Sequence, residues 1–488
     1  MKACLAVIGA LALCMLSAAR ADNPSVPMNA DLPIQEQVVD VGMPGVVVTT
    51  GTIAVPELHA EAAAGGANVR TIALGFVRVR RERAPTRDAH VMLAGGPGDS
   101  SVRQVMAMLG RGDPSALMLF DGDLIAIDQR GTGRSSPNLV VDMPYGLPLD
   151  AAGSPGLWLP LMRAKVRDAL RELHARGIRP EAYNTRESAD DVDRLRHRLG
   201  YERVTLWGRS YGTHLALSVL RRHPARVARL VLVAPEGPDD TWKLPSQVEP
   251  VLDLLGRRAG DPMFVPRMRR VLARLDAEPV EVDVADPVTG ETRRVVLGAF
   301  DLQWLTAQAL ADPRSMARLP MAYRMMEAGD MRDLARLALV SRRRAGIGNA
   351  MGPLIDLASG ASADRGARIA AESPDALLGD ALNFPVRALA DAWQVVDLGD
   401  AFRAPVSGDA PMIVFAGDLD ARTPVENARR LVANLPNARL VIVENGTHAF
   451  DFFGTPALRE ETLRFLRGEP QTQSRIALEP LPFPAVAR

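Results

Sequence analysis

One serine of this chain stands where a nucleophile could be built. Residues 204–207 are a short apolar stretch with strand character, residues 215–220 are apolar at helical spacing, and Gly-Arg-Ser-Tyr-Gly lies between them at 208–212. A turn this tight needs glycine on both sides of Ser210 and holds the hydroxyl group outward. The five-residue pattern alone recurs by chance, so the prediction rests on the flanking strand and helix. Together they predict an exposed serine nucleophile.

A serine hydroxyl is a weak nucleophile at neutral pH, so it needs a base and a group that orients the base. After a strand-turn-helix serine, the acid and the histidine follow in that order, on late strands. A predicted strand at 412–416 runs into Asp418 and Asp420, and one at 439–443 runs into His448. We favour Asp420, because Asp418 adjoins the strand end and can simply hold the turn. The other six histidines flank strands or lie on helices, which favours His448 as the base.

Attack on a carbonyl builds negative charge on oxygen, which fixed N–H donors must stabilise. One predicted donor is the backbone N–H of Tyr211, directly after the serine. The other is expected in the Gly-Gly-Pro-Gly loop at 95–98, where we assign it to Gly96, with Gly95 as the alternative. An ordinary tight turn is the simpler interpretation. A phosphate-binding or dinucleotide loop is excluded, because the required Lys-Ser/Thr and G-x-G-x-x-G patterns are missing.

The strands that would position these residues are short and apolar, and glycine-containing loops follow them. This pattern predicts an α/β fold with a mostly parallel central sheet flanked by helices. The predicted parallel strands before residue 237 lie at 90–93, 124–127, 204–207 and 227–233. Earlier β-branched stretches at 45–53 and 71–79 should form an antiparallel pair. A helix capped by Ser188 and ended by Gly200 should precede the strand that leads into the serine.

The strand pattern stops after the sixth predicted strand and resumes at residue 412. The intervening segment has helical patterns and one hairpin at 286–290, so we expect a mainly helical lid inserted after the sixth strand. The predicted divisions are a signal peptide at 1–21, the amino-terminal part of the core at 22–236, the lid at 237–403, the carboxy-terminal part of the core at 404–470 and a Pro-rich tail at 471–488. We expect residues 22–45 to be irregular.

The first 21 residues have the pattern of a secretory signal. A lysine near the start is followed by an apolar run over 3–18 and a small-x-small site at 19–21. The run is shorter than the roughly 20 residues that a membrane-spanning helix needs, and no later segment reads as a span. We therefore expect cleavage after Ala21 and a periplasmic or secreted protein that begins at Asp22.

The composition is that of a soluble globular protein with a sizeable core: 488 residues, 47% hydrophobic and 24% charged. This excludes disorder and collagen-like structure. The 58 basic residues balance the 58 acidic ones, so nothing indicates a nucleic-acid or anionic-membrane partner. Both cysteines, Cys4 and Cys14, fall within the predicted signal. The mature chain is therefore expected to have no disulfide and no Cys-ligated metal.

Five motifs in this order resemble those of the prolyl iminopeptidase and tripeptidyl aminopeptidase family of α/β-hydrolases. They are Gly-Gly-Pro-Gly at 95–98, Asp-Gln-Arg-Gly-Thr-Gly at 128–133, Gly-Arg-Ser-Tyr-Gly-Thr at 208–213, Gly-x-x-Asp-x-x-Thr-Pro at 417–424 and Gly-Thr-His at 446–448. The resemblance implies the α/β-hydrolase fold, a triad and an oxyanion hole made by Ser210, Asp420, His448, Gly96 and Tyr211. It also implies a cis peptide bond before Pro97 and a structural role for the loop of Asp128 and Arg130. Family members often carry His where this chain has Ala94, and the lid matches no family motif.

The triad pattern and the resemblance predict a serine hydrolase, most specifically an exopeptidase that releases N-terminal residues or short peptides through an acyl-enzyme, without metal or cofactor. The alternatives are a carboxylesterase acting on small esters, because the same groups cleave esters, and a non-catalytic binding protein on a hydrolase fold. An aminopeptidase must bind a free ammonium group, which requires carboxylates at the pocket. The candidates are Glu236, Asp239 and Asp240, where the lid begins. Helix-start or solvated charges are the simpler interpretation of these three.

Overall fold

A ten-stranded sheet forms the centre of the fold. The computed structural model describes residues 34–64, 69–81, 87–111 and 117–484, so the predicted signal at 1–21 lies outside it. In spatial order the strands are β1 (Gln35–Val39), β2 (Val46–Pro56), β3 (Thr71–Arg81), β5 (Asp123–Ile127), β4 (Asp88–Leu93), β7 (Arg203–Arg209), β8 (Val227–Val233), β12 (Met412–Gly417), β13 (Ala438–Glu444) and β14 (Arg475–Ala477). From β5 to β14 all neighbours pair in parallel, which confirms the mostly parallel sheet.

Three antiparallel pairings extend this sheet at one end. β2 and β3 form the predicted antiparallel pair, and β3 also pairs antiparallel with β5. Outside them, β1 pairs antiparallel with β2, with Gln35 opposite Thr52. The prediction that 22–45 is irregular is therefore wrong for β1. Its residues are mostly exposed, because an edge strand needs little apolar sequence when its neighbour supplies the backbone hydrogen bonds.

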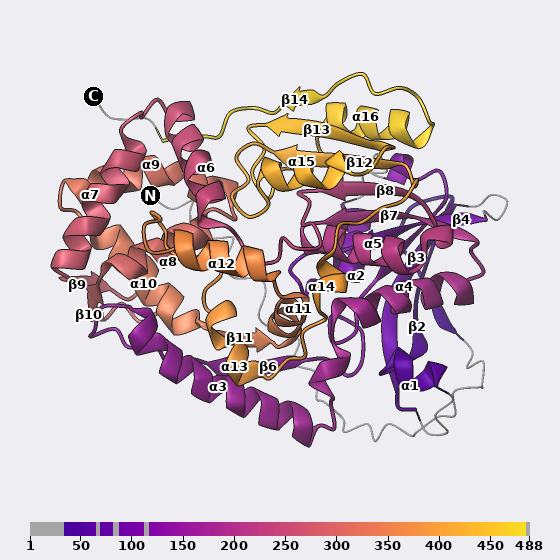
Figure 1. The fold of residues 1–488 in the computed structure, drawn as a ribbon, viewed down its shortest axis with the longest axis horizontal. Helices are drawn as coiled ribbons and strands as arrows, with labels where there is room; N and C mark the ends of the chain where they lie inside the picture. The colour runs from indigo at the N-terminus through magenta and orange to yellow at the C-terminus, as the bar shows by residue number, and fades with distance from the viewer. Residues whose placement is uncertain (1–33, 65–68, 82–86, 112–116, 485–488) are drawn as a thin grey trace.

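Helices cover both faces of the sheet. On one face α4 (Thr185–Arg198), α5 (Tyr211–Arg222) and α15 (Val425–Ala433) contribute to the largest hydrophobic cluster, to which α3 (Pro155–Ala175) adds residues from a position away from the sheet (Figure 1). On the other face α2 (Ser101–Gly110) and α16 (Pro456–Leu466) pack against residues such as Trp207 and Val231. The short helix α1 (His59–Ala63) lies between β2 and β3. Apolar residues on both faces of the central strands explain their near-continuous apolar sequences.

The helix before the nucleophile strand begins earlier than predicted. The side chain of Asn184 accepts a hydrogen bond from the N–H of Glu187, so Asn184 is the cap of α4. Ser188 lies inside the helix, and its prediction as the cap is wrong. The helix gains almost one further turn because the Asn-Thr-Arg-Glu sequence at 184–187 also satisfies the capping pattern.

The segment between β8 and β12 forms the mainly helical insertion, which extends from the left to the centre of Figure 1. Its helices are α6 (Pro245–Arg258), α7 (Phe264–Ala277), α8 (Ala299–Ala309), α9 (Pro313–Glu327), α10 (Arg332–Arg344), α11 (Met351–Ser359), α12 (Ala363–Glu372), α13 (Ala390–Trp393) and α14 (Asp400–Arg403). β9 (Val280–Ala285) and β10 (Thr292–Leu297) form the predicted hairpin. A separate pair joins β6 (Val140–Pro144) to β11 (Gly346–Asn349). Because β1 precedes the predicted strands, the insertion follows the seventh described strand of the large sheet, and not the sixth.

The insertion and the sheet share two connections that matter for the site. The insertion has its own hydrophobic cluster from α6 to α10, and Leu419 and Ala421, in the loop after β12, are fully buried within it. The tail adds β14 to the sheet, and Leu481 and Phe483 then pack against the same cluster. The described part of the predicted tail therefore contacts both the sheet and the insertion.

Candidate active site

The turn between β7 and α5 carries Ser210 in a rare backbone conformation, with φ 52° and ψ −128°. The two glycines that flank Ser210 leave no room for a side chain. A Cβ atom at Gly208 would lie 2.5 Å from the carbonyl oxygen of Gly212, and a Cβ at Gly212 would lie 2.1 Å from the carbonyl oxygen of Leu93. Neither contact is tolerable for a side chain, so the glycine spacing follows from the geometry of the turn.

The loops after β12 and β13 bring an acid and an imidazole to this serine. His448 Nε2 lies 3.0 Å from Ser210 Oγ, and His448 Nδ1 lies 2.9 Å from Asp420 Oδ2. Both distances are within hydrogen-bond reach. The chain order and the geometry are those of a nucleophile, a base and an orienting acid.

Hydrogen bonds from its own loop fix the Asp420 carboxylate. Oδ1 accepts from the backbone N–H groups of Arg422 at 2.8 Å and Thr423 at 2.9 Å, and Oδ2 accepts from the Thr423 hydroxyl at 2.7 Å. Burial alone would raise the pKa of Asp420, but His448 and the Thr423 hydrogen bonds outweigh it and hold this pKa below its ordinary value. The buried carboxylate is thus kept ionised beside the imidazole.

The competing candidate, Asp418, is placed elsewhere. Its carboxylate accepts from Arg258 at 2.6 Å and from the backbone N–H of Asn445 at 2.9 Å. These bonds tie the strand end to α6 and to the loop after β13. Of the two acids, only Asp420 contacts His448 among the described residues.

The glycine loop after β4 passes directly beside the serine. A Cβ atom at Gly95 would lie 3.1 Å from Ser210 Cβ and 3.7 Å from its Oγ, and Gly96 has φ +107°. The Gly96–Pro97 peptide bond is cis, as the resemblance implies. The Ser101 hydroxyl supports the loop by accepting from the N–H of Ala94 at 2.9 Å.

The loop at 128–133 supports the site from behind. Asp128 accepts from the Ser100 hydroxyl at 2.7 Å and from the N–H of Arg134 at 2.8 Å. Arg130 is fully buried and forms a two-point ion pair with Asp191 at 2.7 and 2.8 Å. Both side chains are engaged in holding loops together, and neither lines the cavity beside Ser210.

A cavity of about 640 Å³ opens over Ser210 between the sheet and the insertion. Its charged lining includes Glu236, Lys243, Asp356 and Arg422. Lys243 Nζ donates to Glu236 Oε2 at 2.7 Å, so these two charges are already paired. The cavity lining therefore combines acidic and basic groups with apolar residues of the insertion such as Trp242 and Phe384.

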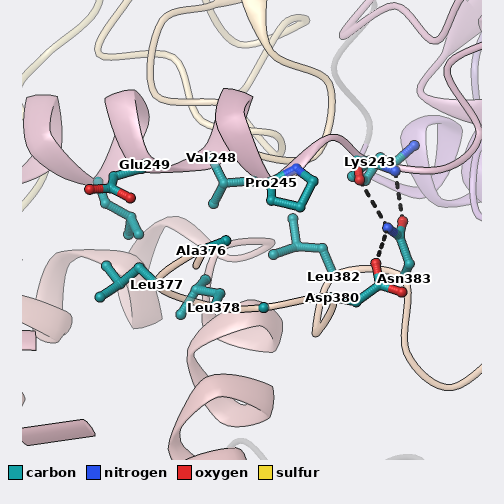
Figure 2. Close-up of a pocket in the computed structure, with 12 residues that line it drawn as sticks. Lys243, Pro245, Val248, Glu249, Ala376, Leu377, Leu378, Asp380, Leu382 and Asn383 are labelled. Atoms are coloured by element: carbon teal, nitrogen blue, oxygen red, sulfur yellow. Dashed lines mark hydrogen bonds between the residues drawn. The ribbon is translucent and has the colours of Figure 1, made fainter. Parts of the chain in front are cut away.

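Asn383 fixes the main chain of Lys243, and both residues line this cavity as well as the separate pocket drawn in Figure 2. It accepts from the Lys243 N–H at 2.6 Å and donates to the Lys243 carbonyl at 2.9 Å (Figure 2). The Asn383 side chain also donates to Asp380 at 2.6 Å. The segment at 380–384 is thus joined to the start of α6, and Phe384 from this segment lines the cavity.

The structure separates the three acids at the start of the insertion. Glu236 lines the cavity, whereas Asp239 and Asp240 do not. Asp239 accepts from the N–H and the hydroxyl of Ser362 at 2.7 and 2.6 Å, at the start of α12. Asp240 is buried and pairs with two guanidinium groups, those of Arg365 at 2.9 Å and Arg430 at 2.6 Å. Asp239 thus joins two parts of the insertion, whereas Asp240 also joins the insertion to α15 of the core.

Sequence reasoning missed Asp356, which lines the same cavity from the middle of α11. Burial raises the pKa of its carboxyl to about 8, and nearby Glu236 adds to the rise, whereas Lys243 and Arg422 lower it. Within the described residues its carboxyl group has no hydrogen-bond partner. The signal in the sequence was weak: one acid among the apolar residues at 354–358.

Neither a cluster of metal-binding side chains nor a membrane-spanning helix occurs in the described ranges. Within them, no group of three or more His, Cys, Asp or Glu side chains is arranged to hold a metal ion. None of the helices in these ranges combines the length and the apolar character that a membrane crossing demands.

A sequence model for the family described as "alpha/beta hydrolase fold" matches residues 91–455, which is most of the chain. No curated protein matches. Among solved structures, the chain is similar to a bromoperoxidase from Bacillus anthracis, with 13% identity, a TM-score of 0.36, and coverage of 82% of this chain and 96% of that one. It is also similar to a thermophilic esterase from Thermogutta terrifontis, with 15% identity, a TM-score of 0.36, and coverage of 82% of this chain and 94% of that one. For a proline iminopeptidase-related protein from Thermus thermophilus the identity is 16% and the TM-score 0.36, and the match covers 89% of this chain and 98% of that one.

Proposed function

Since the chain belongs to the α/β hydrolase fold family, we propose that it is a serine hydrolase of the exopeptidase type, releasing N-terminal residues or short peptides. The observation that carries the hydrolase part is the chain of contacts from Asp420 through His448 to Ser210, at 2.9 and 3.0 Å. A hydroxyl, a base and a buried carboxylate in this order form the arrangement that serine acyl transfer needs.

In the proposed reaction Ser210 Oγ attacks the substrate carbonyl carbon while its proton passes to His448 Nε2. The carbonyl oxygen becomes negatively charged and is held by the backbone N–H groups of Gly96 and Tyr211. The bond to the leaving nitrogen then breaks, and His448 gives it the proton, which leaves an ester on Ser210. Water, deprotonated by His448, attacks this ester and releases the acid. Asp420 orients the imidazole and stabilises its positive form throughout.

The exopeptidase assignment is supported by acidic groups in the cavity over the serine. Glu236 and Asp356 both line it; Glu236 pairs with Lys243, and Asp356 lies within the electrostatic reach of Lys243 and Arg422. A substrate ammonium group can enter this cluster and share the Glu236 carboxylate. Asp239 and Asp240 take no part in the proposal, because guanidinium and hydroxyl groups already engage them.

The same cluster offers a specific argument for a second function, a carboxylesterase. Lys243 neutralises Glu236 at 2.7 Å, and Asp356, with a pKa of about 8, is mostly protonated at neutral pH. The cavity would then present little net negative charge to a substrate. Such a site suits the uncharged group of a small ester as well as it suits an ammonium group.

The test compares the protein that begins at Asp22 with its Ser210→Ala variant. Substrates are aminoacyl and tripeptidyl anilides with free and blocked amino termini, and short acyl esters. Turnover of free-amine anilides that is lost on blocking and in the variant supports the exopeptidase. Cleavage of esters alone supports the esterase. No turnover, together with no fluorophosphonate labelling of Ser210, would refute both and leave a binding protein on a hydrolase fold.

We also propose that the chain is exported and that residues 1–21 are removed. The support is the pattern of the first 21 residues alone. Expression of the full sequence in a bacterium, followed by fractionation and N-terminal sequencing, tests this. A mature protein in the periplasm or the medium that begins at Asp22 supports export, and an uncleaved cytoplasmic product contradicts it.

A further inference from the structure

A second cavity, of about 320 Å³, lies behind the nucleophile strand on the α2 side of the sheet. Its aromatic lining is Trp207 from β7 together with Phe452 and Phe453 from the loop that follows His448. The Trp207 and Phe453 rings are stacked, with centroids 6.5 Å apart, and Phe452 packs edge-on against Phe453 at 5.3 Å. The volume is at the lower end of the roughly 300 to 1,000 Å³ range of small-molecule sites.

This cavity adjoins the one over the serine. Gln104 and Arg209 line both cavities, and Arg209 directly precedes Ser210 in the chain. The second cavity therefore begins at the residue next to the nucleophile. The second cavity has no part in the function proposed above.

The Arg209 guanidinium at this junction lies 5.7 Å from the centroid of the Phe450 ring and keeps hydrogen-bonding capacity. Its Nη2 donates to the carbonyl oxygens of His448 at 2.9 Å and Phe450 at 3.1 Å. Within the described residues no carboxylate lies within ion-pair distance, and Nε and Nη1 make no hydrogen bond. By contrast, the fully buried Arg130 and Arg342 each form an ion pair with an aspartate at 2.7 and 2.6 Å. A guanidinium group usually binds a carboxylate through two N–H groups, so Arg209 retains capacity for one.

The other charges at this cavity leave it positive. Arg111 and Asp451 are exposed at its rim, and Asp451 Oδ1 already accepts from the N–H of Gly454 at 2.8 Å. The carboxylates of Asp420 and Asp451 attract the Arg209 guanidinium electrostatically, but neither lies within ion-pair distance of it. Two guanidinium groups against one rim carboxylate favour an anionic ligand over a cationic one.

The position of His448 tells which part of a substrate would reach this cavity. In the proposed reaction His448 gives its proton to the leaving atom, so the leaving group departs on the imidazole side. The loop that continues from His448 supplies Phe452 and Phe453, and Arg209 holds the carbonyl of His448 itself. His448 itself lines the cavity over the serine, and the aromatic cavity follows along the same loop, so a leaving group that extends past the imidazole can reach it.

We propose that this second cavity binds the leaving group, and that it selects leaving groups with an apolar or aromatic body and a free carboxylate, which Arg209 receives. For a peptide this means a short substrate whose C-terminal residue directly follows the cleaved bond. For an ester it means an aryl alcohol that carries a carboxylate. The inference rests on the proposed serine hydrolase function, because that function defines which group leaves.

The test measures binding without turnover, by calorimetry on the Ser210→Ala variant. The probes are 3-phenylpropionate and its neutral amide. We expect the acid to bind at least about tenfold more tightly than the amide, because a hydrogen bond to a charged group is lost in the amide. Adding Arg209→Gln should remove this preference, whereas Arg209→Lys should keep part of it. Adding Phe453→Ala should weaken both probes and leave their ratio unchanged.

Equal affinity for acid and amide, or a preference that survives Arg209→Gln, overturns the site. The decisive measurement is the ratio of the affinities for the acid and the amide. Arg209 also supports the His448 loop, so its loss can lower activity through structure alone. Thermal unfolding of each variant checks that it is folded. If the acid preference depends on Arg209 but the wild type hydrolyses nothing, the cavity stands as an anion site and only the proposed function fails.

Discussion

Replacing Asp420 by asparagine removes one charge and keeps the shape of the side chain. The two backbone N–H groups of Arg422 and Thr423 donate to Oδ1, so the amide oxygen of the variant must stay at that position. The amide nitrogen then occupies the place of Oδ2, 2.9 Å from His448 Nδ1. An N–H group facing Nδ1 forces the imidazole to carry its hydrogen on Nε2, which faces Ser210. In that tautomer His448 cannot accept the serine proton.

The expected loss in kcat is about 10³- to 10⁴-fold, which corresponds to roughly 4 to 5.5 kcal/mol of transition-state stabilisation. KM should change little, because Asp420 is fully buried and does not line the cavity. The residual activity would come from the oxyanion donors and from binding. The assay is hydrolysis of p-nitrophenyl acetate, which reports serine acyl transfer whether the natural substrate is a peptide or an ester.

Asp418→Asn is the matched control, because it removes the same charge two residues away. Asp418 contacts Arg258 and Asn445 and not His448, so kcat should stay within about threefold of the wild type. Thermal unfolding shows that both variants are folded. An Asp420→Asn variant that keeps more than about one tenth of kcat, or two variants that lose activity equally, would refute the tautomer argument.

Other contacts support three more predictions. Gly95→Ala should lower kcat about ten- to hundredfold with a nearly unchanged melting temperature, since its Cβ would lie 3.1 Å from Ser210 Cβ; an unchanged kcat would mean that the glycine loop is free to move away. Asp356 has a pKa raised to about 8, so the folded state binds its proton where the unfolded state does not, and stability falls as pH rises from about 4 to 8. As the pH rises over this range, the melting temperature of Asp356→Asn should therefore increase relative to that of the wild type. A difference in melting temperature that does not change with pH would contradict the raised pKa. Arg342→Met leaves the buried Asp301 without its 2.6 Å ion pair and should cost about 3 to 5 kcal/mol in urea unfolding, partly recovered by adding Asp301→Asn; no recovery would place the cost in packing.

The parts of the site that the sequence predicted are those that local backbone geometry dictates. The turn around Ser210 needs glycine at fixed positions, and the acid and the imidazole must follow particular strands. Asp420 could be preferred over Asp418 because a residue adjoining a strand end is available to bond the next loop, as Asp418 does with Asn445. These arguments involve only neighbours in the chain or in the sheet.

The parts that escaped prediction depend on contacts between distant segments. Asp356 lines the cavity because α11 packs over it. The second cavity forms because Phe452 and Phe453, from the loop after β13, contact Trp207 of β7 on the same face of the sheet. The strand β1 escaped because an exposed edge strand carries little apolar pattern. The roles of Asp239 and Asp240 could not be told apart by sequence, since their partners Ser362 and Arg365 lie more than 120 residues away.

The loop that holds Asp420 links the size of a substrate to the rate of the chemical step. Leu419 and Ala421, on either side of Asp420, are buried in the hydrophobic cluster of the insertion. Any motion that loosens this cluster therefore also broadens the range of positions open to the carboxylate. We expect a substrate that contacts both the insertion and the sheet to restrict this motion as it binds, so that part of its binding energy helps to order the carboxylate and the imidazole. A truncated substrate that fills only the space above Ser210 forgoes this gain, so shortening the substrate should lower kcat as well as affinity.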